Sequence, residues 1–260
     1  MSFLRREDIT EERIAAWIAE GKKLGYKGYM TRQQREASRR RFLSKLHRTD
    51  PLWIFGYGSL MWAPAFDHAE RAPAMLHGWH RSFCFWTAMG RGTPTMPGLM
   101  LALERGGQCQ GVAYRIAPSK VHSETEVVWR REMISGVYRP QWVTVSTAKG
   151  PRPAVTFVIN RGHQLYTGHI SRQKVAHHVA FAEGRNGTCR DYLTNTMDHL
   201  TQLGIVDRDM KELSRLVRHL RADLPPMEIR PGLNLGQSPM PDQQQKATLA
   251  ASQNTGRDVA

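Results

Sequence analysis

One glutamate of this sequence has the surroundings that proton-transfer chemistry needs. Helical spacing over residues 124–135 places Glu132 one turn beyond Val128, within an apolar stripe, while Arg130 and Arg131 can point away to either side. A carboxyl group among apolar side chains resists ionisation, so we expect its pKa to rise toward the range useful for proton transfer. The alternative is a glutamate that only pairs with a core arginine or a backbone donor.

A second candidate is the segment Phe55-Gly56-Tyr57-Gly58-Ser59-Leu60, which follows a short apolar run. Two glycines permit a turn that side chains would block, and successive N–H groups in such a turn can bind an anion. With the Ser59 hydroxyl, the segment predicts a loop for a carboxylate or phosphate. The dinucleotide fingerprint and the nucleophile elbow are not met, because Met61 and Tyr57 stand where glycines are required. The alternative is a tight turn between strands.

Short strands must position these two segments, since apolar runs dominate residues 51–160. The predicted strands are Leu52–Phe55, Trp79–Phe85, Leu99–Leu103, Val112–Ile116, Trp142–Val145 and Val155–Ile159. One helix lies among them, with a Ser123-x-x-Glu126 capping pattern at its start and Gly136 at its end. This order predicts an α+β domain built on a curled sheet or barrel.

Helical spacing flanks the strand-rich region on both sides. Residues 1–50 predict two helices, the first capped by Thr10 and the second ended by Asp50-Pro51. Residues 161–225 predict three more, whose apolar stripes include Val175, Tyr192 and Leu213.

Three regions follow from this pattern: a basic helical extension over 1–50, a folded domain over 51–225 and a polar tail over 226–260. The tail is rich in Gln, Pro, Ser and Gly, and we expect it to be disordered because it has little apolar surface to bury.

The chain is basic, with 37 Lys and Arg against 23 Asp and Glu and a net charge of +14. Residues 1–50 hold 13 basic and 7 acidic side chains, and residues 51–225 hold 21 and 13, so the charge is spread. This spread does not favour a nucleic-acid partner. The dense run from Arg35 to Arg41 is either a solvated helix face or a contact for a polyanion.

Compartment and metal use are also constrained by the sequence. No apolar run approaches the roughly 18 residues of a membrane span, and the N-terminus has no signal-peptide stretch. Three widely spaced cysteines suit a reduced cytoplasm, where we expect the protein to reside. The eleven histidines form no zinc-binding motif, so no metal is expected.

Six blocks in order resemble the ChaC-like family of γ-glutamylcyclotransferases over about residues 51–221. The blocks are Trp53-Ile-Phe-Gly-Tyr-Gly-Ser-Leu-Met-Trp62, Gly78-Trp-His-Arg-Ser-Phe83, Gly92-Thr-Pro with Pro97-Gly-Leu-Met-Leu-Ala-Leu103, Gly111-Val-Ala-Tyr-Arg-Ile116, Trp129-Arg-Arg-Glu-Met133 and Gly187-Thr-Cys-Arg-Asp-Tyr-Leu193. The resemblance implies a small mixed β-barrel with surrounding helices. It also implies a lyase that cleaves glutathione to 5-oxoproline and cysteinylglycine without any cofactor.

The resemblance gives the candidate residues roles. Glu132 would take a proton from the substrate's α-amine, which then attacks the γ-carbonyl of the same molecule. The main chain of residues 55–60 would hold the γ-glutamyl group. Arg81 would pair with a substrate carboxylate, or it faces solvent from its strand. Tyr192 would offer a hydroxyl at the pocket wall, or it packs in a helix core, and Tyr57 would touch the substrate or anchor the loop.

Two other functions remain open on the sequence. A related cyclotransferase could act on other γ-glutamyl amides or peptides, since it would share the loop and the glutamate. A non-catalytic protein could bind a polyanion through the basic N-terminal helix. The sequence does not define the oligomeric state.

Overall fold

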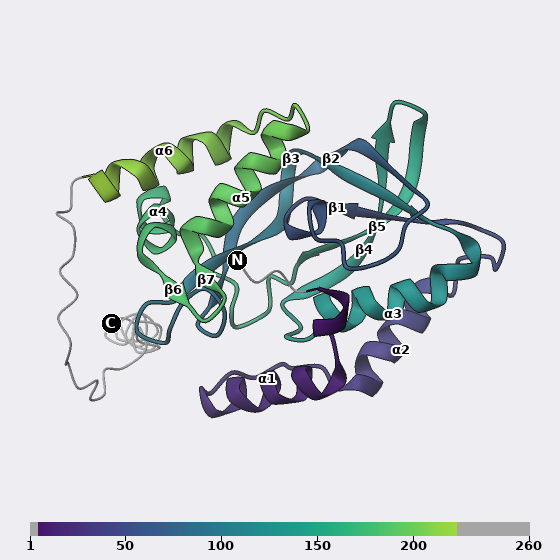
Figure 1. Ribbon diagram of the computed structural model, residues 1–260, viewed down its shortest axis with the longest axis horizontal. Helices are drawn as coiled ribbons and strands as arrows, with labels where there is room; N and C mark the ends of the chain where they lie inside the picture. The colour runs from purple at the N-terminus through teal and green to yellow at the C-terminus, as the bar shows by residue number, and fades with distance from the viewer. Residues whose placement is uncertain (1–4, 223–260) are drawn as a thin grey trace, which may run out of the picture. The chain divides into compact units, whose positions relative to one another are not determined.

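A closed five-stranded barrel forms the centre of the molecule (Figure 1). The computed structural model describes residues 5–222, so the predicted tail over 226–260 lies outside the described residues. Around the barrel the strands run in the order β1 (Leu52–Gly56), β3 (Gly98–Ile116), β2 (Glu70–Thr87), β4 (Tyr138–Thr147) and β5 (Gly150–Ile159). β1 runs parallel to β5 and antiparallel to β3, so the barrel is mixed, and the predicted α+β barrel fold is confirmed.

β3 is one long strand, so the prediction of two separate strands in this region is wrong. Leu99–Leu103 and Val112–Ile116 are its two ends. The polar residues between them stay paired with β2 through a register shift between His77 and Trp79. Gly106 and Gly107 have φ values of +104° and +67° there, a conformation that favours glycine. The polar residues between the two predicted strands therefore belong to an exposed stretch of one paired strand.

The helix that carries Glu132, α3 (Val121–Glu132), is displaced by three residues from its predicted position. It begins after a 3₁₀ turn at Pro118–Lys120, which starts the helical path early. The predicted capping box is wrong, because the Ser123 hydroxyl donates to the carbonyl of Lys120 within the helix. As a result Glu132 is the last residue of the helix.

The five predicted helices outside the barrel are present. They are α1 (Glu11–Lys23) and α2 (Arg32–Leu43) before it, and α4 (Arg172–Phe181), α5 (Cys189–Gln202) and α6 (Arg208–Ala222) after it. The predicted end of the second helix at Asp50-Pro51 is wrong, because α2 already ends at Leu43, where Ser44 donates its N–H to the carbonyl of Arg41. Thr10 caps α1 by accepting a hydrogen bond from the Arg13 N–H at 3.2 Å. A short hairpin of β6 (Glu183–Gly184) and β7 (Gly187–Thr188) joins α4 to α5.

Residues 5–46, called here the N-terminal segment, pack against α3, and α2 and α3 lie side by side in Figure 1. Arg35 and Arg39 of the dense basic run are buried. Arg35 pairs with Glu11, and Arg39 pairs with Glu36 and donates to Thr125 of α3. The run is therefore only partly a solvated face, because two of its arginines fasten helices together.

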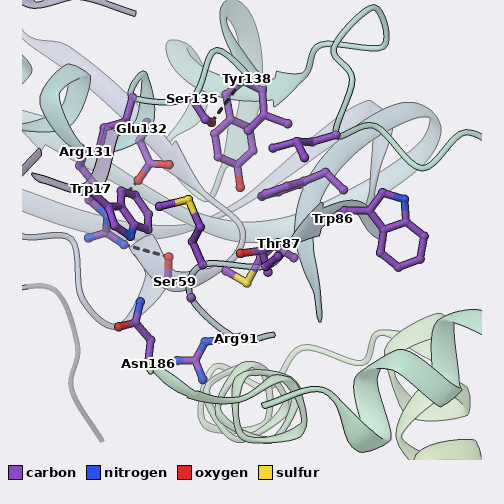
Figure 2. Close-up of a pocket in the computed structure, with 18 of the residues that line it drawn as sticks. Trp17, Ser59, Trp86, Thr87, Arg91, Arg131, Glu132, Ser135, Tyr138 and Asn186 are labelled. Atoms are coloured by element: carbon purple, nitrogen blue, oxygen red, sulfur yellow. Dashed lines mark hydrogen bonds and ion pairs between the residues drawn. The ribbon is translucent and has the colours of Figure 1, made fainter. Parts of the chain in front are cut away.

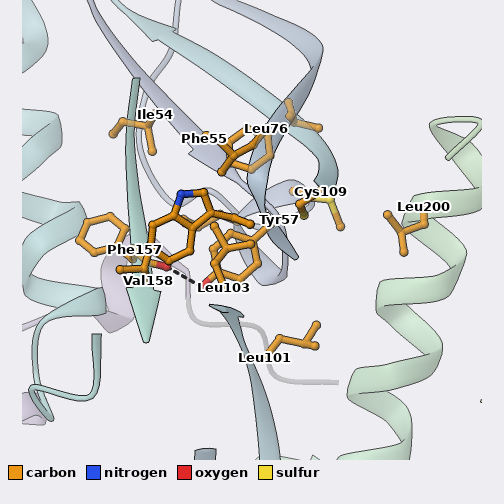
Figure 3. Packing of buried hydrophobic residues seen from close by; sticks show 14 of the residues in the cluster. Ile54, Phe55, Tyr57, Leu76, Leu101, Leu103, Cys109, Phe157, Val158 and Leu200 are labelled. Carbon is orange, nitrogen blue, oxygen red and sulfur yellow. Dashed lines mark hydrogen bonds between the residues drawn. The ribbon is translucent and has the colours of Figure 1, made fainter. Parts of the chain in front are cut away.

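Apolar side chains from all five strands fill the barrel. Figure 3 shows Ile54 and Phe55 of β1 near Phe157 and Val158 of the neighbouring strand β5, and all four are buried. The free cysteines Cys84, Cys109 and Cys189 are also buried. Burial raises the pKa of the Cys109 thiol to about 11, so this thiol stays protonated at neutral pH.

Residues 5–222 contain neither a membrane-spanning helix nor a cluster of potential metal ligands. Among these residues no helix is long and apolar enough to cross a membrane. The same residues contain no group of three or more His, Cys, Asp or Glu side chains placed to hold a metal ion.

Candidate active site

A cavity of about 230 Å³ opens beside the end of α3 (Figure 2). Glu132 and Arg131 line it from the helix, and Ser59 lines it from the loop after β1. The cavity therefore brings together the two candidates of the sequence, the glutamate and one residue of the loop.

Glu132 is enclosed in this cavity, with 12% of its side chain exposed. Burial raises its pKa above the ordinary value of 4.5, although the positive charge of Arg131 opposes the rise. The expected rise in the pKa is thus confirmed. The expected orientation of Arg131 is wrong, because its Nε lies 3.0 Å from Oε1 of Glu132. Arg130 does turn outward, toward Glu11 and Glu126.

Arg131 connects the glutamate to the loop. Its Nη2 donates to the Ser59 hydroxyl at 2.8 Å, and its Nη1 donates to the carbonyl of Ala63. These acceptors draw the side chain across the cavity wall toward Glu132. One guanidinium therefore fixes the position of both predicted site elements.

The loop itself is held mainly by the core. Of residues 55–60, Ser59 lines the cavity, whereas Phe55, Tyr57 and Leu60 are buried. The Tyr57 hydroxyl donates to the carbonyl of Phe157 at 2.7 Å, as Figure 3 shows, which matches an anchoring position for Tyr57.

Both loop glycines are closely packed. A Cβ on Gly56 would lie 2.8 Å from Cβ of Leu60. A Cβ on Gly58 would lie 3.1 Å from the Tyr192 hydroxyl. The loop therefore folds tightly under the wall of the cavity.

Backbone donors of the loop remain available. Met61 donates to the carbonyl of Gly58, and Trp62 and Ala63 donate to the carbonyl of Ser59. Between residues 5 and 222, the backbone N–H groups of Gly58 and Ser59 have no hydrogen-bond acceptor. Two adjacent donors in a turn form the arrangement that binds an anionic oxygen.

Arg81 lies behind the loop and does not line the cavity. It is 3% exposed and donates to the carbonyl of Tyr57 at 2.8 Å, with Asp207 as its ion-pair partner at 2.5 Å. A third nitrogen donates to the carbonyl of Gln110. Each terminal nitrogen has an acceptor within the protein, so the guanidinium supports the loop. Arg81 was predicted either to pair with a substrate carboxylate or to face solvent, and its buried position behind the loop matches neither prediction.

Tyr192 of α5 does line the cavity, and its ring is 4% exposed. It packs edge-on to Phe83 and tilted against Trp62. Burial raises the pKa of its hydroxyl well above 10, so it remains a neutral donor near Gly58. Tyr192 therefore both lines the cavity and packs in the core, the two alternatives that the sequence left open.

Further lining residues were missed by the sequence analysis. Arg91 follows β2, and Asn186 lies in the turn between β6 and β7. Tyr138 begins β4, with its hydroxyl donating to the carbonyl of Leu101 at 2.7 Å. Arg91 and Asn186 directly precede the blocks that begin at Gly92 and Gly187, so proximity to these blocks was an available signal.

Close backbone packing positions Arg91 and Asn186. A Cβ on Gly92 would lie 2.1 Å from the nitrogen of Gly98, so only glycine allows the chain to fold back there. The Asn186 N–H donates to the carbonyl of Gly90 at 2.8 Å. Figure 2 shows the two side chains next to each other at one side of the cavity. Among the described residues Arg91 forms no ion pair; it donates to the carbonyl of Thr188 and lies over the Tyr192 ring at 5.3 Å.

The N-terminal segment adds three aromatic side chains to the cavity wall: Trp17, Tyr26 and Tyr29. The sequence analysis set this segment apart as an extension, so the contribution was missed. Its apolar residues signalled burial but did not indicate which surface they would cover.

Known proteins match this chain in both sequence and fold. The family model for ChaC-like proteins matches residues 52–220. The Escherichia coli (strain K12) protein named glutathione-specific gamma-glutamylcyclotransferase is 39% identical over 202 residues, which cover 77% of this chain and 87% of the relative. The human glutathione-specific gamma-glutamylcyclotransferase 1 is 28% identical, with 67% of this chain and 80% of the relative covered.

A solved structure shares the fold. The crystal structure of a yeast γ-glutamylcyclotransferase specific to glutathione superimposes with a TM-score of 0.60 at 21% identity, over 65% of this chain and 96% of that one. Because the family model covers most of the barrel and its helices, this chain belongs to the ChaC-like family.

Proposed function

We propose that this protein cleaves glutathione, in the cytoplasm, by cyclising its γ-glutamyl group to 5-oxoproline and releasing cysteinylglycine. The observation that carries the proposal is an enclosed glutamate, Glu132, whose raised pKa suits proton transfer. The names of the E. coli and human relatives support glutathione as the substrate. The three buried free thiols suit a reducing compartment.

The reaction begins with a proton transfer. Glu132 accepts a proton from the α-ammonium group of the substrate. An α-amino group has a pKa of roughly 8. The raised pKa of Glu132 reduces the difference between the two pKa values and so makes the proton transfer less unfavourable. The freed nitrogen then attacks the γ-carbonyl carbon of the same molecule, so no protein nucleophile is needed. Since the attack is intramolecular, the entropy of bringing the two groups together is already lost.

Collapse of the tetrahedral intermediate completes the cleavage. The new C–N bond closes the five-membered lactam, and the original amide C–N bond breaks. Glu132 returns its proton to the departing amine nitrogen, and the second proton of the ring nitrogen also passes to that amine. Cysteinylglycine therefore leaves with an ammonium group, the lactam keeps one N–H, and Glu132 is again a carboxylate. The N–H groups of Gly58 and Ser59 are the donors suited to the developing oxyanion.

Arg91 takes the role of carboxylate partner in this proposal. The glycine end of glutathione carries a carboxylate, and Arg91 is a cavity-lining cation with no ion pair among residues 5–222. Arg81 has its donors occupied inside the protein, so we assign it the positioning of residues 57–59 instead.

The test is a product assay on the full chain. The protein is incubated separately with glutathione, γ-glutamyl-alanine and γ-glutamyl-ε-lysine, and 5-oxoproline is measured by mass spectrometry. We expect product from glutathione at the highest rate. Absence of product from glutathione would contradict the proposal, and faster product from another amide would identify a related cyclotransferase.

The polyanion-binding alternative has less support. It depends on the arginines of α2 as a free surface, and Arg35 and Arg39 are buried in contacts within the protein. The alternative can be tested by measuring DNA-binding affinity at increasing salt concentrations. Binding through a basic surface predicts an affinity that falls steeply with salt.

A further inference from the structure

Part of the cavity wall comes from outside the region that the family model matches. The model covers residues 52–220, whereas Trp17, Tyr26 and Tyr29 belong to the N-terminal segment. All three rings are partly buried, and burial raises the pKa of Tyr29 to about 12. These aromatic side chains are unexplained by the proton-transfer chemistry at Glu132.

Several contacts fix this segment to the helix that carries Glu132. The Met30 N–H donates to the carbonyl of Ile134 at 2.9 Å. Glu11 pairs with Arg130 of α3, and the Ser38 hydroxyl accepts from the Trp129 indole at 3.3 Å. The aromatic wall is therefore held in place before any substrate arrives.

The same segment contacts the far side of the cavity, where Arg91 and Asn186 lie. The Tyr29 hydroxyl donates to Sδ of Met89 at 3.2 Å, two residues before Arg91. The Arg185 guanidinium, one residue before Asn186, lies over the Trp17 ring at 5.8 Å and pairs with Glu20 at 2.5 Å. Trp17 and Tyr29 thus belong to the part of the wall that holds Arg91 and Asn186.

Packing between α1 and Tyr29 leaves no spare room. A Cβ on Gly21 would lie 1.7 Å from the Tyr29 hydroxyl and 2.8 Å from Sδ of Met89. The absence of a side chain at Gly21 therefore lets Tyr29 reach Met89. The contact is specific, which is what a wall that selects among ligands requires.

We propose that Trp17 and Tyr29 are specificity-determining residues, which contact the amine half of the substrate and favour a cysteinylglycine-sized leaving group. This inference rests on the proposed function. Glu132 and the loop N–H groups must hold the γ-glutamyl half, because that half contains the reacting atoms. The amine half then extends toward Arg91 and Asn186, and aromatic rings cover its apolar surface there.

The test compares two substrates in three proteins: the wild type, Trp17→Ala and Ile18→Ala. Ile18 is the matched control, because it follows Trp17 in α1 and packs on the cluster of Val127 and Ile134 without lining the cavity. For each protein, kcat/KM is measured with glutathione and with γ-glutamyl-alanine, whose leaving amine is smaller.

We expect Trp17→Ala to lower kcat/KM for glutathione about tenfold, chiefly by raising KM. The kcat/KM for γ-glutamyl-alanine should change less than twofold. Tenfold corresponds to ~1.4 kcal/mol of lost binding. Ile18→Ala should leave the ratio of the two values unchanged. Tyr29→Leu, like Trp17→Ala, should reduce the ratio of kcat/KM for glutathione to kcat/KM for γ-glutamyl-alanine.

The inference would be overturned if Trp17→Ala lowered kcat/KM equally for both substrates or for neither. It would also be overturned if Ile18→Ala changed the ratio of the two values as Trp17→Ala does. Failure of the proposed function has a different signature. In that case the wild-type protein itself forms no 5-oxoproline from glutathione.

Discussion

The Nε of Arg131 lies 3.0 Å from Oε1 of Glu132, although the two residues are consecutive in α3. Consecutive residues of a helix normally point in different directions. Here Ser59 and Ala63 accept the other nitrogens of Arg131 and draw its side chain across the cavity wall. Glu132 and the loop are therefore coupled through one guanidinium, and Figure 2 shows the three side chains together.

Removal of the proposed base, Glu132, should stop turnover. Glu132→Gln keeps the size of the side chain but cannot accept the proton, and general base catalysis contributes roughly 10²–10⁴ in rate. We expect kcat to fall by about that factor, with an unchanged circular dichroism spectrum. Glu126→Gln is the matched control, since Glu126 lies in the same helix and pairs with Arg130 at its edge. Full activity in Glu132→Gln would exclude Glu132 as the base.

The pH dependence of the reaction should report the Glu132 carboxyl group. The base must be unprotonated, so kcat/KM falls as the pH is lowered through its pKa, which burial places above 4.5. Arg131 lowers this pKa. In Arg131→Gln that effect is lost, and the acidic limb of the profile should move to higher pH. An acidic limb that stays in place or moves to lower pH contradicts the assignment.

Arg91 should matter only for substrates that carry the terminal carboxylate. Hydrogen bonds to charged groups contribute about 1.5–3 kcal/mol, so Arg91→Met should raise KM for glutathione roughly tenfold to a hundredfold. Glutathione amide, which lacks the carboxylate charge, is the matched substrate, and its KM should change little. If both substrates lose equally, Arg91 acts by supporting the fold.

A side chain at Gly58 should disturb the loop. A Cβ there lies 3.1 Å from the Tyr192 hydroxyl, so Gly58→Ala displaces either the loop or the ring. We expect kcat/KM to fall at least tenfold while the melting temperature changes little. Tyr192→Phe removes the hydroxyl oxygen that the new Cβ would meet. Gly58→Ala should therefore lower kcat/KM less when it is made in Tyr192→Phe than when it is made in the wild type. Strictly additive losses would show that the two positions are not coupled.

Acid should loosen the N-terminal segment through Glu36. Arg39 and Arg40 lower the pKa of Glu36 from 4.5 to about 2. A depressed carboxyl pKa stabilises the folded state above the unfolded value, and this contribution is lost as the pH falls from about 4.5 to about 2. Urea unfolding should show wild type more stable than Glu36→Gln at about pH 6 and equal to it near pH 2. A pH-independent difference would contradict the ion-pair explanation.

Much of the fold was predictable from local pattern. Period-two and 3.6-residue spacing located the strands and helices, because each face of an element must match its surroundings. The errors arose where a local rule competed with tertiary pairing. Two separate strands were predicted on either side of residues 104–111, yet the polar residues between them remain paired with β2 in one long strand. A Ser-x-x-Glu pattern suggested a cap at Ser123, yet a preceding 3₁₀ turn starts the helix earlier.

The sequence by itself determined the chemistry that this protein can offer. It placed Glu132 in an apolar stripe and two glycines in a turn after a buried strand, and both properties depend on residues near one another in the chain. The tertiary structure alone decided which distant residues complete the site. Arg81 and Arg91 look equivalent in the sequence, but Arg81 is buried against Asp207 and Arg91 lines the cavity. Likewise only the packing of α1 on α3 brought Trp17 to the cavity, because hydrophobic spacing predicts that a face is buried but not what covers it.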